Sequence, residues 1–146
     1  SIYKRTEEQK KMIKDRLENV RVNNQSTKIS ALNRWFSEDF IKKNHDTYKK
    51  IYSMLEKNDH SSFLKSYELF ANYIDDESMI KKIKAKTLVT TGENDPGSTP
   101  EMSKNLSKLI KGSEFIEIKS GKHLCSIECA DDVNIVFKKF IDKNNG

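Results

Sequence analysis

The sequence predicts an α/β protein in which a helical region, residues 1–82, precedes a β-α-β-α unit of parallel sheet, residues 83–146. No glycine or proline occurs before Gly92, which favours helix throughout the first region. After Lys86 the spacing of apolar residues changes from a helical to a strand pattern. Two strands that alternate with helices form a right-handed parallel unit by default.

Composition limits the size of the core and the class of protein. The chain has 146 residues, of which 35% are hydrophobic and 34% are charged. Typical globular chains are about 45–50% apolar and about 25% charged, so we expect one modest domain, or part of a larger one, with a thin core. No apolar run of about 18 residues predicts a membrane span, and the first residues lack a secretory signal. With two cysteines and no such signal, we expect a reducing cytoplasm.

The formal net charge of +5 does not by itself indicate a nucleic-acid partner. The lysines are spread over every segment, usually with Glu or Asp nearby, and the arginines do not cluster. Grooves that follow a phosphate backbone need a basic stripe with interleaved aromatic residues. We therefore expect neither a nucleic-acid nor a membrane partner.

The first region carries a series of helical apolar stripes. Ile13, Leu17 and Val20 recur at i, i+4 and i+7, and Asn23-Asn24 should end that helix. The remaining stripes predict helices around 26–36 and 46–57, a helix from Ser61 or Ser62 that carries Phe63, Tyr67, Phe70 and Ile74, and short turns at 37–41 and 75–83.

The second region predicts strands over 87–91 and 115–118. Between them, Ser98 and Glu101 have the spacing of a capping box, and Pro100 suits the first turn of a helix that Gly112 ends. A closing helix presents an apolar face made of Val133, Val136, Phe137, Phe140 and Ile141. Two parallel strands are too few for an independently stable sheet, so we expect the earlier strands of a longer sheet to be absent from this chain.

Two loops at the carboxyl ends of the predicted strands hold the groups most suited to chemistry. Asp95 follows the first strand and His123 follows the second. Adjacent parallel strands bring such loops together, at the edge where ligands gather in open α/β sheets. An aspartate there can accept the imidazole Nδ1–H and stabilise the imidazolium that forms when the histidine takes a proton. The alternative is that Asp95 opens a turn and His123 caps a strand end.

These segments resemble the α/β-hydrolase family. The stretch Thr87–Asp95 is similar to its seventh strand and acid loop, and Gly121–Leu124 is similar to the loop that carries its catalytic histidine. The upstream helices resemble the cap inserted between strands six and seven. Arg34-Trp35-Phe36, ENDPGSTP and GKHLCSIE resemble, more narrowly, 3-oxoadipate enol-lactonases and related ester hydrolases.

The resemblance implies a C-terminal half of an enzyme that cleaves an ester or lactone without a metal or organic cofactor. It implies catalytic roles for Asp95 and His123, and substrate contacts for Trp35, Arg34 and Leu124. The Gly-x-Ser-x-Gly elbow that carries the family's nucleophile is absent, since no two glycines are four apart. We therefore expect these residues alone to be inactive, with the missing N-terminal half of the core as a partner and a homodimer as a further possibility.

Other interpretations remain open from the residues alone. Trp35 could be core and Arg34 a surface residue, and the absent nucleophile could be Asp or Cys instead of Ser. Cys125 and Cys129 with His123 fall short of the four ligands of structural zinc, so small buried cysteines are expected. A non-catalytic helical module that binds protein or nucleic acid is the rival hypothesis. It gives no reason for Asp95 and His123 to be within hydrogen-bond reach.

Overall fold

The computed structural model describes residues 3–22 and 24–145, with the side chains of 24–26 left aside. The chain forms two compact units. One contains Arg5–Asn33 and Glu38–Ile74; the other contains Ser1–Lys4, Arg34–Ser37 and Asp75–Gly146.

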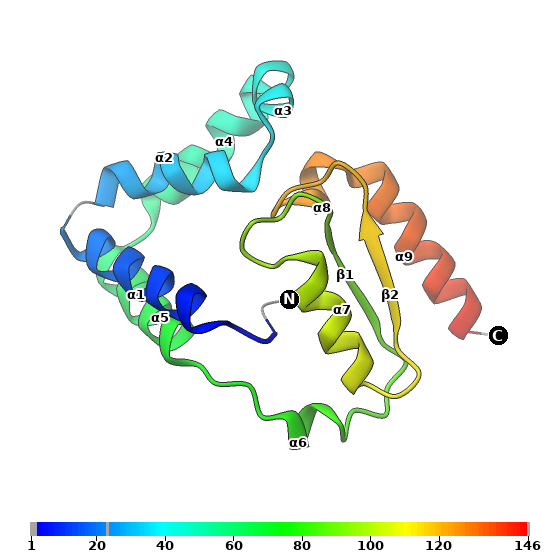
Figure 1. Ribbon diagram of the computed structural model, residues 1–146. Coiled ribbons are helices and arrows are strands. Elements are labelled where there is room, and N and C mark those ends of the chain that lie inside the picture. Colours follow the sequence, from blue (N-terminus) through cyan, green and yellow to red (C-terminus); the bar gives the residue numbers. More distant parts are fainter. Residues whose placement is uncertain (1–2, 23, 146) are drawn as a thin grey trace. The chain divides into compact units, whose positions relative to one another are not determined.

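The first unit is helical. Its helices are α1 (Glu7–Val22), α2 (Asn24–Trp35, whose last two residues belong to the other unit), α3 (Glu38–Lys43), α4 (His45–Lys57) and α5 (His60–Asn72). Helices α1 and α5 lie side by side, and α3 packs on α4 (Figure 1). Leu17, Val20 and Ala71 are buried in this unit. The predicted helices are present. Of the predicted break at Asn23-Asn24, Asn23 lies outside the described residues.

The start and end of α5 differ from the prediction. Asp59, rather than Ser61 or Ser62, caps the helix: its carboxylate accepts the Ser62 N–H at 2.7 Å. The helix ends at Asn72 because Tyr73 is extended, so Ile74 leaves the predicted stripe and is 84% exposed. Aspartate and serine are N-caps of similar strength, so Asp59 can take the place of either serine. The apolar stripe does not predict the end of the helix, because its spacing continues to Ile74 while the backbone becomes extended at Tyr73.

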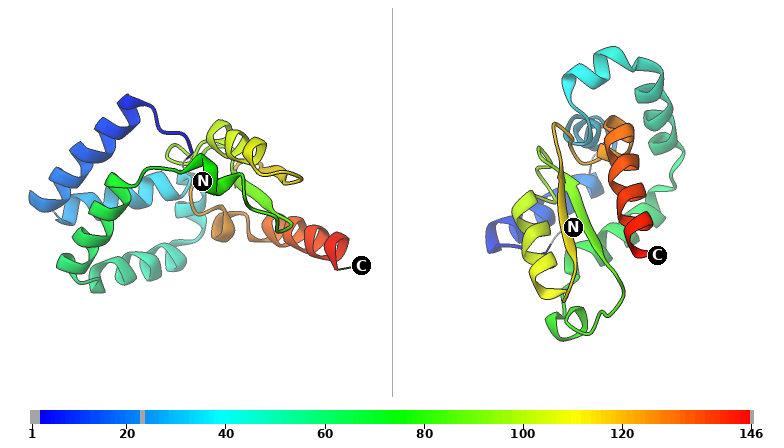
Figure 2. Two further views of the ribbon diagram at one scale, coloured as in Figure 1. Left: turned by 90° about the horizontal axis from the view of Figure 1, so that it is seen from below. Right: turned by 90° about the vertical axis from the view of Figure 1, so that its right-hand side faces the viewer.

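The second unit has the predicted β-α-β-α order. After a short helix α6 (Glu77–Ile80) come β1 (Leu88–Gly92), α7 (Pro100–Leu109), β2 (Glu114–Ile118), a short α8 (Cys125–Glu128) and α9 (Ala130–Asn144). In the described part of the chain the sheet consists of β1 and β2, which pair in parallel from Leu88↔Glu114 to Gly92↔Ile118. Helices α7 and α9 lie on opposite faces of these strands (Figure 2).

Two details of this unit correct the sequence prediction. The N-cap of α7 is Thr99, whose side chain accepts the Met102 N–H, and not Ser98. On α9, Val133 is buried, but Phe137 and Ile141 are about half exposed, although they were expected on the core face. A sheet of two strands is too narrow to cover the apolar face of a 15-residue helix.

Candidate active site

The loop after β1 holds Asp95 in one orientation. Its Oδ1 accepts the backbone N–H groups of Gly97 at 2.8 Å and Ser98 at 2.9 Å. A further hydrogen bond ties this loop to β1: the Thr91 hydroxyl donates to the Ser98 carbonyl at 2.6 Å. Aspartate commonly accepts such bonds in turns, so the turn role and the orientation of the carboxylate are two effects of the same contacts.

Backbone contacts join this loop to the loop after β2. The N–H of Asn94 donates to the Gly121 carbonyl at 2.8 Å, and the N–H of Glu93 donates to the Ile118 carbonyl at 2.8 Å. The approach is close enough to require glycine: a Cβ on Gly92 would lie 2.6 Å from the carbonyl carbon of Gly121. Hydrogen bonds therefore hold the two strand ends together, and the lack of a side chain at Gly92 permits their close approach.

This arrangement brings Asp95 and His123 into contact. Asp95 Oδ2 lies 2.8 Å from His123 Nδ1, while the aspartate side chain is 3% exposed and the histidine side chain is 42% exposed. With Asp95 ionised, Nδ1 carries the proton and donates it, which leaves Nε2 as the acceptor nitrogen. The pair thus joins a buried carboxylate to a solvent-accessible imidazole.

The electrostatics of the pair favour the ionised acid. Burial acts to raise the pKa of Asp95, but the hydrogen bonds from His123, Ser98 and Gly97 together outweigh it. The pKa of Asp95 therefore lies below its usual value. A carboxylate that stays charged can stabilise an imidazolium beside it.

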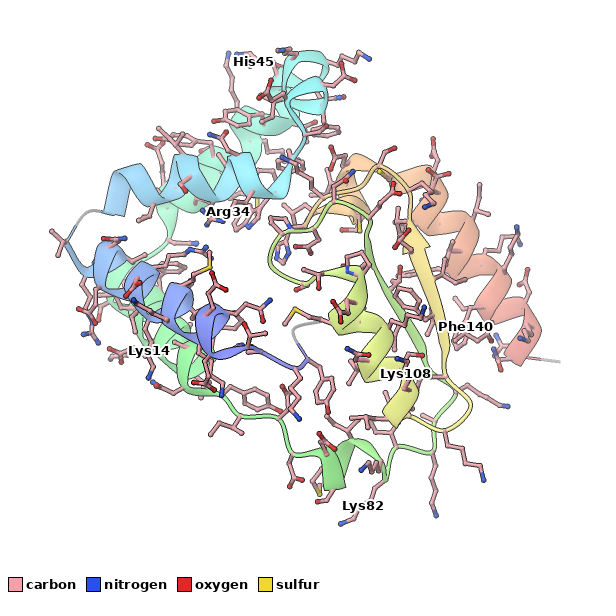
Figure 3. All side chains as sticks on the ribbon, viewed as in Figure 1. Lys14, Arg34, His45, Lys82, Lys108 and Phe140 are labelled. Carbon is pink, nitrogen blue, oxygen red and sulfur yellow. The ribbon has the colours of Figure 1, made fainter. Side chains whose placement is uncertain are left out.

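Trp35 and Leu124, two of the predicted substrate residues, lie next to His123. The Trp35 and His123 rings are stacked, with centroids 6.3 Å apart and planes 27° from parallel. The backbone N–H of Leu124 donates to the Trp35 carbonyl at 3.1 Å. Arg34, the third predicted residue, is half-buried in the last turn of α2 (Figure 3).

Glu128, at the end of α8, is a member of this neighbourhood that sequence reasoning did not single out. Its Oε1 accepts the Ser37 N–H at 2.9 Å, and its Oε2 accepts the Lys122 N–H at 3.0 Å. The available signal was an acidic residue five positions after His123 within GKHLCSIE. The short helix α8 was also not predicted, because four residues carry too little periodicity.

The cysteines show no features of a reactive or metal-binding pair. Cys125 and Cys129 are free thiols, and burial raises the pKa of both. Reactive cysteines usually have a lowered pKa. Among residues 3–22 and 24–145, no group of three or more His, Cys, Asp or Glu side chains could hold a metal ion. Within the same residues, no helix has the length and apolar character needed to cross a membrane.

Comparison with known proteins identifies the fold. No family model matches the chain. The chain is 27% identical over 145 residues to (E)-2-((N-methylformamido)methylene)succinate hydrolase of Acinetobacter baylyi, a match that spans 97% of this chain and 53% of that protein. The chain therefore spans about half the length of this curated relative.

Solved structures agree in fold and in extent. The enol-lactonase from Burkholderia xenovorans superposes with a TM-score of 0.81 at 22% identity, over 88% of this chain and 49% of that one. A thermophilic esterase from Thermogutta terrifontis also gives a TM-score of 0.81, at 20% identity, over 98% and 53%. The chain thus has the fold of the carboxyl-terminal half of an α/β-hydrolase, as the resemblance implied.

Proposed function

We propose that this chain supplies the acid and the histidine of a serine-type α/β-hydrolase that cleaves an ester or lactone. One observation carries the proposal: Asp95 Oδ2 lies 2.8 Å from His123 Nδ1, while two backbone amides hold Oδ1. A binding module has no reason to build such a pair at the carboxyl ends of two parallel strands. The similarity to an enol-lactonase and to esterases supports the same reaction class.

In this mechanism His123 is the general base and Asp95 keeps it in the productive tautomer. Nε2 takes the proton of a serine hydroxyl as its oxygen attacks the substrate carbonyl carbon. The imidazolium, stabilised by ionised Asp95, then gives that proton to the departing alkoxide. In the second half, Nε2 takes a proton from water as the hydroxide attacks the acyl group, and returns it to the serine oxygen.

The nucleophile has to come from outside this sequence, because no Gly-x-Ser-x-Gly elbow occurs in it. We place the nucleophile and the oxyanion hole in a segment that precedes Ser1. On this proposal the chain alone hydrolyses no ester above the uncatalysed rate, and the longer protein does.

We further propose that the substrate carries a carboxylate that Arg34 binds. The names of the relatives favour this class: one hydrolyses a succinate derivative, and the esterase structure is described as malate-bound. Arginine pairs with carboxylates through two parallel hydrogen bonds. Trp35 and Leu124, beside His123, would contact the remainder of the acyl group.

The test is hydrolysis of a carboxylated and an uncharged ester by the longer protein. His123→Ala and Asp95→Asn should each lower kcat by about 10⁴-fold or more, in keeping with triad enzymes. Arg34→Ala should raise KM for the carboxylated ester alone. Full activity of His123→Ala would refute the proposed role of the histidine. An unchanged KM in Arg34→Ala would refute only the carboxylate contact.

A further inference from the structure

The backbone on both sides of His123 is tied by hydrogen bonds. On one side the Lys122 N–H donates to Glu128 Oε2 at 3.0 Å. On the other side the Leu124 N–H donates to the Trp35 carbonyl at 3.1 Å. The residue that carries the imidazole therefore sits between two anchored amides.

The same carboxylate also holds the segment that carries Trp35. Glu128 Oε1 accepts the Ser37 N–H at 2.9 Å, two residues after Trp35, and the intervening Phe36 is fully buried. Glu128 is itself fixed, because its backbone N–H donates to the Leu124 carbonyl at 3.0 Å. The result is a closed loop of contacts from Trp35 through Leu124 and Glu128 back to Ser37.

The rings of Trp35 and His123 face each other inside this loop, with centroids 6.3 Å apart. The bond to Asp95 holds the imidazole at Nδ1, and the Trp35 ring lies against one of its faces. The Glu128 carboxylate bridges the two backbone segments that carry these rings. A neutral side chain at 128 could not accept both amides with charge-assisted strength.

We propose that Glu128 is a positioning residue for His123: its carboxylate couples the loop that carries the histidine to the segment that carries Trp35, and so holds the two rings in stacking contact. Glu128 acts through these two backbone amides and takes no proton in the reaction. The inference deepens the proposed function, since the histidine it positions is the proposed base. The contacts themselves do not depend on hydrolysis.

The test uses the chain itself, in which Trp35 is the sole tryptophan. A protonated imidazole in contact with an indole quenches its fluorescence, so the emission of Trp35 should be lower at a pH where His123 is protonated than at one where it is neutral. His123→Gln should abolish this step. Glu128→Ala should remove at least half of its amplitude, while Glu128→Gln, which keeps one acceptor oxygen, should fall between the two. Glu56→Ala, at an exposed position on α4, is the matched control and should leave the step unchanged.

Circular dichroism separates loss of coupling from loss of folding. Full quenching amplitude in a folded Glu128→Ala chain would overturn the proposal. If that variant unfolds, amide hydrogen exchange of the wild-type chain decides the matter. The Ser37 and Lys122 amides should exchange at least ten-fold slower than an unstructured chain, and unprotected amides there would overturn the proposal. Neither readout involves ester cleavage, so an inactive longer protein would refute the proposed function and leave this result standing.

Discussion

Substitution of Gly92 by alanine should separate the two loops of the site. A Cβ at this position would lie 2.6 Å from the carbonyl carbon of Gly121, and closer still to the carbonyl oxygens of Gly121 and Lys122. Ordinary contact begins at 3.4 Å, so the backbone has to move by at least about 0.8 Å to relieve the contact with the carbonyl carbon, and further to clear the two oxygens. The atoms in the way are main-chain atoms, which cannot rotate aside as a side chain does.

This movement of the backbone in Gly92→Ala should lower the free energy of unfolding. Forcing a methyl group into a packed site typically costs about 1–3 kcal/mol, and for a chain of this size each kcal/mol lowers Tm by about 2–4 °C. The measurement is urea unfolding followed by circular dichroism, because the slope also shows whether the denatured state has changed.

Gly97→Ala is the matched control, since a Cβ there would meet only Asp95 Oδ1 at 3.6 Å, an ordinary contact. It should change the free energy of unfolding by less than about 0.5 kcal/mol. A Gly92→Ala chain as stable as the Gly97→Ala chain would refute the close approach of the two loops. A Gly92→Ala chain that is destabilised while Gly97→Ala is not would support it.

Three further predictions follow from single contacts. The pKa of Asp95 is lower in the folded chain than in the unfolded chain, where it is about 4, so the ionised carboxylate adds stability that is complete above about pH 4 and is lost as the pH falls through the folded pKa. In urea unfolding between pH 6 and pH 2, Asp95→Asn should therefore lose less stability than wild type. Equal losses would contradict this prediction. The hydrogen bond to Glu77 raises the pKa of Tyr3 to about 12. A spectrophotometric titration of the wild-type chain should therefore show a phenol that ionises at about that pH and that is missing in Tyr3→Phe. Identical titration curves for the two chains would contradict the contact. Thr99→Ala should cost about 0.5–2 kcal/mol through loss of the α7 cap, and more than Ser98→Ala; the reverse order would restore Ser98 as the cap.

The sequence was most informative where local chemistry and topology agree. The change from helical to strand period at Lys86 gave the β-α-β-α order, and parallel strands bring the residues after them to one edge. That was enough to make the contact between Asp95 and His123 one of two alternatives, and the structure shows the contact. The site residues on short irregular segments were harder to find.

Glu128 and Thr99 show why the rest was not predictable. Glu128 acts through the backbone amides of residues 37 and 122. The order of side chains in a sequence does not predict which backbone amide a carboxylate will accept. Ser98 and Thr99 are adjacent candidates of nearly equal capping propensity. The choice between them was made by the Asp95 turn, which already uses the Ser98 N–H and carbonyl.

The exposed residues of α9 have a different cause. Apolar spacing predicts the face that a helix would bury against a full sheet, and the described residues supply β1 and β2. Phe137 and Ile141 therefore belong to a predicted core face that these strands do not cover. The sequence pattern indicated the helix correctly, but apolar spacing alone does not say that the two predicted strands leave part of that face uncovered.

The protonation of the His123 ring tests the central claim most directly. In the ¹⁵N-labelled chain, long-range ¹H–¹⁵N correlation at a pH where the imidazole is neutral distinguishes the two ring nitrogens. The contact with ionised Asp95 predicts that Nδ1 carries the proton and that Nε2 is bare, as a general base requires. A proton on Nε2 with a bare Nδ1 would contradict the acid–base pair on which the proposed function rests.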